Sequence, residues 1–212
     1  MSWIRVRFVT LIDTVVALAG RRAAWCVIDL LWFQELMIEP VRWFDRTWNF
    51  SLPGGAFPAV LERLRGTPAR AVALTTGVPE DVLSARTGSA WSAKEHLAHL
   101  DDLHDLDEKR FAQYLEREGT LAAADVTNER THTANHNATS VLQILTRLQT
   151  HRQALVTRME LATAEDVETV CVHPRLGQRL RLIDWACFVA EHDDHHLALA
   201  RLAIRSAVVT LT

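Results

Sequence analysis

One segment near the end of the chain, from about residue 182 to 205, constrains the fold more than any other. Its apolar residues recur at the spacing of an α-helix, and at about 100° per residue they fall within about 60° of one direction. The residues that share this direction are Trp185, Phe188, Val189, His192, His196, Leu199 and Ala203. An apolar stripe of this length has to pack against other elements, so it predicts a long helix in the core of a helical protein.

Helical patterns also run through the middle of the chain. A helix is predicted over residues 92–118, where Ser92 and Glu95 form a capping-box pattern. No pair of alternating strands is evident, so the predicted fold class is all-α, a bundle of packed helices. The remaining expectations, in chain order, are helices at 57–66 and 67–75, a loop with one helical turn at 77–90, irregular chain at 119–136, a helix at 138–162 and a connector at 170–180.

Composition excludes several classes of protein. The chain has 212 residues, 49% hydrophobic and 23% charged, which is typical of a globular protein of about one domain. Its 23 Lys and Arg against 26 Asp and Glu give a net charge of −3 without a compact basic block, so we expect no nucleic-acid partner. The cysteines Cys26, Cys171 and Cys187 form no CxxC pair, which favours a reducing compartment and a cytoplasmic location.

Residues 1–36 differ from the rest in being rich in Trp, Val, Leu and Arg. The uncharged run after Asp13 covers only residues 14–20, whereas a membrane span needs about 20 apolar residues. Asp13 also interrupts the apolar stretch that a signal peptide requires. We therefore expect no membrane association, and we divide the chain into an N-terminal extension, 1–36, and a helical domain, 37–212. The extension is helical or not native to the domain, and a chain that starts at Met37 is expected to fold and bind metal.

Two histidines in the middle of the apolar stripe carry the functional prediction. His192 and His196 lie one turn apart, so their rings face one point, as in helical H-x-x-x-H metal pairs. A lone buried histidine is usually a satisfied core residue, but each member of a pair needs partners, and an unmet buried polar group costs about 1–3 kcal/mol. Metal binding is therefore favoured over a structural role. His195 lies to one side of the pair, and Asp193 and Asp194 are expected to be exposed.

A third metal ligand is expected from a facing helix, because catalytic zinc commonly has three protein ligands and one open position. The predicted middle helix supplies His96 near the centre of its apolar stripe and His99 at the edge, and spacing alone does not choose between them. His104 is expected to point into water. Asp102 shares the side of His99 and could orient its ring or reach the metal, and Glu95 is a similar candidate unless the helix cap occupies it.

Three strings, WSAKEHLAHLDDLHDL, HPRLG and IDWACFVAEHDDHHLALAR, resemble the DinB/YfiT-like superfamily of metal-dependent enzymes, and the resemblance covers about residues 37–204. It implies a four-helix bundle, often dimeric, in which three histidines hold one divalent metal ion. The first ligand of the family stands in an H-L/I-x-D context that matches His99, and the other two match His192 and His196. Imidazole ligands suit zinc, nickel, copper and iron, of which we place zinc and nickel first.

The resemblance implies an enzyme, because members with known activities use low-molecular-weight thiols in transferase or isomerase reactions. A divalent ion with an open position can activate a thiol or water near neutral pH, and the resemblance places thiol chemistry on a small-molecule substrate ahead of hydrolysis. Asp102, His195 and His173 are candidates for moving the proton, although His173 is expected to be exposed in its connector. The alternatives are a hydrolase, a non-catalytic metal-binding stress-response protein whose fourth metal position Asp102 would fill, and a purely structural bundle.

Overall fold

The computed structural model describes residues 38–211, and from Val41 onward the chain forms one compact unit. The predicted extension, residues 1–36, lies outside the described residues. In chain order the elements are η1 (Trp43–Asp45), η2 (Gly54–Ala56), α2 (Phe57–Arg65), α3 (Thr67–Thr75), α4 (Glu80–Ser84), α5 (Ala93–Asp102), α6 (His104–Leu115), α7 (Glu129–Thr133), η3 (His136–Ala138), α8 (Val141–Met159), α9 (Ala164–Val167), β1 (Val170–His173), β2 (Gln178–Arg181) and α10 (Leu182–Leu211).

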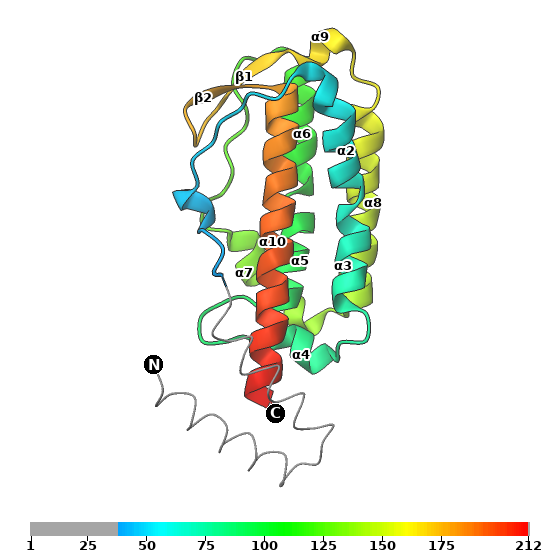
Figure 1. Ribbon diagram of the computed structural model, residues 1–212, viewed down its shortest axis with the longest axis vertical. Coiled ribbons are helices and arrows are strands. Elements are labelled where there is room, and N and C mark those ends of the chain that lie inside the picture. Colours follow the sequence, from blue (N-terminus) through cyan, green and yellow to red (C-terminus); the bar gives the residue numbers. More distant parts are fainter. Residues whose placement is uncertain (1–37, 212) are drawn as a thin grey trace, which may run out of the picture. The chain divides into compact units, whose positions relative to one another are not determined.

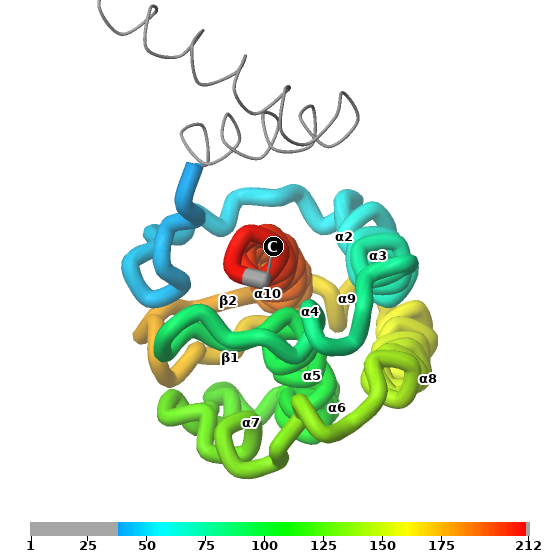
Figure 2. The backbone as a smooth tube through the Cα atoms, turned by 90° about the horizontal axis from the view of Figure 1, so that it is seen from below, coloured from blue at the N-terminus to red at the C-terminus, as the bar shows by residue number. Residues whose placement is uncertain are grey.

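The described residues form a four-helix bundle, which confirms the predicted fold class. Two of its arms are pairs of consecutive helices, α2 with α3 and α5 with α6, and the other two are the single helices α8 and α10 (Figures 1 and 2). Helix α10 has 30 residues and packs on both α5 and α2. The long apolar stripe that predicted it therefore lies inside the bundle, as its length required.

The predicted middle helix is interrupted at one residue. Helix α5 ends at Asp102 and α6 begins at His104, because the amide of Leu103 hydrogen-bonds to the carbonyl of Asp101 and breaks the regular i to i−4 ladder. The start of α5 agrees with the prediction. Ser92 accepts a hydrogen bond from the amide of Glu95, and the Glu95 carboxylate accepts one from the amide of Ser92, so the capping box is complete.

The segment predicted as a connector at 170–180 is a β-hairpin, so the expectation that the chain lacks paired strands is wrong. Strands β1 and β2 pair antiparallel, with Val170 opposite Arg181 and His173 opposite Gln178. The turn between them uses Gly177 at φ +64, a conformation that suits glycine. Four-residue strands offer too short an alternation to be recognised in the sequence. The hairpin leads directly into α10 and fixes the position where that helix begins.

The core has two apolar parts, one at each end of the bundle. The part near the hairpin includes Trp185 and Tyr114, both fully buried, and the other part includes Leu97, Leu148 and Ala200. Along α10 the first part ends at residue 190 and the second begins at residue 197. Residues 191–196, which are polar, therefore lie between the two apolar parts, and this middle layer contains the candidate site.

No helix among residues 38–211 is both long enough and apolar enough to cross a membrane.

Candidate metal centre

Three histidines from two helices meet in the middle layer of the bundle. His99 comes from α5, and His192 and His196 come from α10, one turn apart. One ring nitrogen from each lies within 4.8 Å of one from each of the others. His99 and His196 are buried and His192 is partly buried. The packing of α5 on α10 thus brings together the three residues that the sequence resemblance selected.

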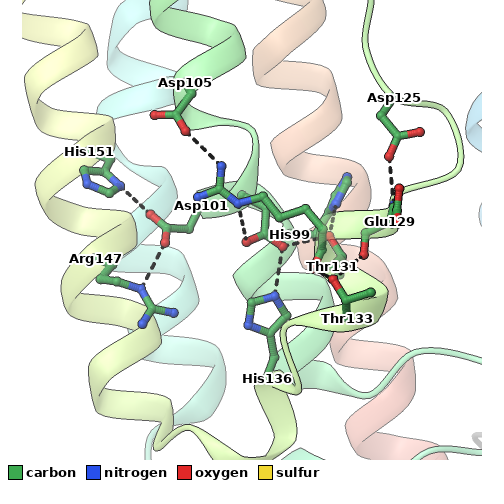
Figure 3. A network of polar contacts seen from close by, with 12 residues as sticks. His99, Asp101, Asp105, Asp125, Glu129, Thr131, Thr133, His136, Arg147 and His151 are labelled. Carbon is green, nitrogen blue, oxygen red and sulfur yellow. Dashed lines mark hydrogen bonds and ion pairs between the residues drawn. The ribbon is translucent and has the colours of Figure 1, made fainter.

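A chain of hydrogen bonds fixes the proton on the ring of His99 (Figure 3). Thr131, on α7, donates its hydroxyl proton to Asp102 at 2.7 Å, and its oxygen lies 2.9 Å from Nδ1 of His99. A hydroxyl has one proton to donate, so Thr131 must accept from Nδ1–H of His99. The other nitrogen, Nε2, then carries the lone pair that a metal ion needs.

Asp102 therefore acts on His99 through Thr131, not by direct contact. Its carboxylate also accepts a hydrogen bond of 2.8 Å from Nε2 of His136. Burial works against ionisation of this carboxyl, but the hydrogen bonds from His136 and Thr131 and the charge of Arg130 lower its pKa. Asp102 is consequently an ionised acceptor and is occupied by these partners.

His96, the other candidate for the third ligand, lies behind His196. The Nδ1 atoms of the two rings are 3.1 Å apart, so one donates a hydrogen bond to the other. His196 can offer the lone pair of Nε2 only when its own Nδ1 carries the proton, and in that arrangement Nδ1 of His96 is the acceptor. His96 is placed to orient His196, and it stands outside the group of three.

The rings of the three histidines are flanked by two tryptophans. Trp43 lies 4.8 Å from His192 between ring centroids, and Trp91 lies 5.1 Å from His99 and 6.0 Å from His196. Burial lowers the pKa of His99 to about 4 and places the pKa values of His192 and His196 well below their usual range. All three imidazoles are neutral at pH 7, which is the form that binds metal ions.

A cavity of about 310 Å³ opens beside this group, and His99 and His192 form part of its wall. His173 also lines the cavity, at the end of β1, and its side chain is 2% exposed. The expectation that His173 is an exposed loop residue is therefore wrong, because the hairpin pairing turns it inward against Phe188, with ring centroids 5.1 Å apart. His195, half-buried, lies beside Trp43 and His196 and is not among the residues of the cavity wall.

Two neighbouring carboxylates on α10 differ from each other and from the prediction. Asp193 is fully buried, so its predicted exposure is wrong. It accepts hydrogen bonds from Arg152 at 2.8 Å and from Thr67 at 2.8 Å, both on helices that face α10. Asp194 is only half-buried and pairs with Arg63 and Arg70 near the surface. A helical wheel places Asp193 away from the apolar stripe, but in the bundle Thr67 of α3 and Arg152 of α8 reach that side of α10.

Other polar residues named from the sequence lie outside the group of three. Glu95 is held by the helix cap and by Arg86. His104 is half-buried and stacks on His151, with ring centroids 4.0 Å apart. Sequence reasoning missed Thr131 and His136, because they stand in a stretch that was expected to be irregular. The one signal in the sequence was the close spacing, within this stretch, of polar residues that can hydrogen-bond to a histidine.

Comparison with known proteins gives two findings. A family model described as the DinB superfamily matches residues 63–200. In the second, a solved structure matches with a TM-score of 0.67 and 16% sequence identity, covering 76% of this chain and 93% of the other. That structure is YfiT from Bacillus subtilis, described as a probable metal-dependent hydrolase with an unusual four-helix bundle topology. No curated protein sequence matches.

Proposed function

Because this chain belongs to the DinB superfamily, we propose that it is a metal-dependent enzyme that hydrolyses a small molecule at a centre formed by His99, His192 and His196. YfiT, which shares the fold, is described as a probable metal-dependent hydrolase. The sequence resemblance alone placed thiol transfer first. The likeness to YfiT reverses that order here.

One observation carries the proposal: three neutral imidazoles converge beside a cavity, and at least one of them is fixed with its lone pair free. Three nitrogen ligands are typical of catalytic sites for zinc and related ions, with one position left for water or substrate. A divalent ion held there would lower the pKa of a bound water toward neutrality and polarise a carbonyl or related group.

The chain's own residues have separate roles in this proposal. Thr131 and Asp102 hold the ring of His99, and His96 holds that of His196. Trp43 and Trp91 limit the access of bulk water to the histidines. His173 lines the cavity and carries its proton on Nε2, because its Nδ1 already accepts a hydrogen bond from the amide of Leu176. We therefore assign His173 to substrate binding and not to the reaction at the metal centre.

Two features favour an enzyme over a non-catalytic metal-binding protein. The carboxylate that could have filled a fourth metal position, Asp102, is occupied by Thr131 and His136. The cavity gives a small molecule room next to His99 and His192. A thiol in place of water is the second candidate, and it rests on the family resemblance.

The test combines metal analysis with activity. The full-length protein should contain one divalent ion per chain and hydrolyse members of a panel of small esters and amides. The His192→Ala/His196→Ala double variant should lose both, whereas His104→Ala, which removes a histidine outside the group, should keep both. Full metal occupancy in the double variant would contradict the proposal.

A second measurement separates water from thiol as the nucleophile. The cobalt-substituted protein is titrated with a soluble thiol while its visible spectrum is followed. Hydrolysis with no spectral change over a wide thiol range supports the hydrolase. A large spectral change, together with thiol conjugation and no hydrolysis, would put the thiol first.

A further inference from the structure

Apart from His99 and His192, the cavity wall contains a group of nitrogen donors that the proposed reaction at the metal centre does not require. It consists of Arg110 from α6, His173 from the end of β1 and Arg175 from the turn between β1 and β2. Arg110 is 4% exposed and His173 is 2% exposed. The three residues line the same cavity; burial lowers the pKa of His173 to about 4, and the charges of both arginines act in the same direction.

Each of these side chains has a buried nitrogen without a hydrogen-bond partner among residues 38–211. The atoms are Nη2 of Arg110, Nε2 of His173 and Nη2 of Arg175. Arg110 donates from Nε to the carbonyl of Ala122, and the Arg175 guanidinium lies over the rings of Phe44 and Phe188, so both side chains are held in place by other contacts. Neither arginine forms an ion pair within the described chain, although a buried charge is normally paired.

The two carboxylates in the same wall do not fill this gap. Asp107 accepts a hydrogen bond from Arg152 at 3.1 Å. Asp125 accepts hydrogen bonds from Thr127 and from the amide of Glu129. Both acids are engaged elsewhere, so Nη2 of Arg110, Nε2 of His173 and Nη2 of Arg175 lack a hydrogen-bond acceptor within residues 38–211, and a buried donor without an acceptor is costly.

We propose that Arg110, His173 and Arg175 bind an oxyanion, a carboxylate or a phosphate, at one end of a small substrate whose other end reaches the three-histidine centre. This inference rests on the proposed function for the reaction, but the binding site itself does not depend on it. Guanidinium groups suit oxyanions because their N–H groups match the spacing of two oxygens. The wall also includes the apolar residues Leu103, Leu106 and Val189, and the volume of about 310 Å³ limits the substrate to a small molecule.

The test measures binding, so that it stands whether or not hydrolysis is found. Calorimetric titrations of the metal-loaded, full-length protein compare phenylacetate and phenyl phosphate with phenylacetamide, which resembles phenylacetate but has no charge. We expect at least one of the two anions to bind about tenfold or more tightly than the amide, and the tighter one identifies the oxyanion. Equal binding of all three would overturn the proposal.

Variants then locate the anion. Arg175→Gln should reduce the preference for the anion about tenfold or more, and Arg175→Lys should restore part of it, because a lysine keeps the charge but loses the fork of donors. Arg110→Gln should act in the same direction, and Arg175, which is less buried, keeps the test valid if the Arg110 variant fails to fold. Arg179→Gln is the matched control, since Arg179 lies on the same hairpin, is exposed and does not line the cavity.

A last experiment distinguishes binding of the anion by the arginines from binding of the anion to the metal ion. The His192→Ala/His196→Ala variant should retain the preference for the anion and its sensitivity to Arg175→Gln. If the preference disappears with the metal and is insensitive to the arginines, the anion binds the metal directly and the inference is wrong. Absence of hydrolysis with an intact, arginine-dependent preference would contradict the proposed function alone.

Discussion

Two groups of buried polar side chains meet on adjacent residues of α10, and they are satisfied in opposite ways. At Asp193 the group is closed: Arg152 bonds both Asp193 and Asp107, and Thr67 adds a further donor to Asp193. At His192 the group is open, because the three histidines present neutral nitrogens to one another and to a cavity. Both groups lie inside the bundle, but the pairing of their polar atoms differs.

This difference in pairing indicates the role of each group. A closed cluster of opposite charges pairs its own charges, so it can join helices without any ligand. An open cluster of like groups leaves lone pairs or donors that a ligand can satisfy. The set of Arg110, His173 and Arg175 is open in the same sense, but its unpaired atoms are hydrogen-bond donors, whereas those of the three histidines are lone pairs. Arg110, His173 and Arg175 line the same cavity as His99 and His192.

The largest expected effect is on the closed group. Arg152→Ala should destabilise the fold by about 3–5 kcal/mol, because it leaves the buried carboxylates of Asp107 and Asp193 without their cation. Chemical denaturation measures the change. Arg147→Ala, on the same helix, removes a half-exposed guanidinium from the buried carboxylate of Asp101, which keeps His151 as a partner, and should cost clearly less. Equal costs would remove the distinction between the closed group and the surface.

On the open group, an effect on metal affinity is expected before any effect on stability. Thr131→Val should weaken metal binding about 10–100-fold, because it removes the acceptor that keeps the proton on Nδ1 of His99. Competition with a chelator measures the affinity. Thr133→Val is the control, since this hydroxyl on the same helix bonds only to backbone carbonyls. If both variants bind metal equally well, the relay to His99 has no function.

His96→Ala applies the same reasoning to His196. This variant keeps all three proposed ligands but removes the contact between the two Nδ1 atoms. We expect the metal affinity to fall about tenfold or more. Unchanged affinity would mean that His96 does not orient His196.

His173 gives a pH dependence of intermediate size. Its pKa is about 4 in the folded chain, against an ordinary value of about 6.5, so below pH 6.5 the unfolded chain binds the proton more readily. Protonation of His173 in the unfolded chain therefore lowers the free energy of unfolding as the pH falls from about 6.5 toward 4. The loss is about 2 kcal/mol at pH 5. His173→Phe, which keeps a ring against Phe188, should lose correspondingly less stability between pH 7 and pH 5.

That comparison is made with both proteins in the same chelator, so that the other histidines contribute equally. Parallel stability curves for wild type and His173→Phe would mean that His173 is not held neutral by its surroundings.

The smallest effect is expected at a histidine pair that belongs to neither group. His104 and His151 stack on each other, and His151 bonds Asp101. His104→Ala should leave the amount of bound metal unchanged, as measured by elemental analysis. A loss of metal there would mean that the open group extends farther than the three histidines.

Local sequence patterns determined most of the helical framework. The stripe over residues 182–205 predicted α10 and placed His192 and His196 on its buried face, and Ser92 with Glu95 marked the start of α5. These features depend on residues within a few turns of each other, where the 3.6-residue period fixes their relative directions. The hairpin at 170–181 was not predicted from the sequence because its strands are only four residues long.

Only the tertiary structure decided which polar groups meet. The helical period left His96 and His99 equivalent, and only the packing of α5 against α10 and α7 put His99 in the group of three and His96 behind His196. Likewise, the burial of Asp193 depends on Arg152, 41 residues away, and the position of Arg110 beside Arg175 depends on the hairpin. A helix fixes the direction of each side chain about its own axis. What that direction faces is set by segments distant in the sequence, and here they determine which groups are paired and which remain open to a ligand.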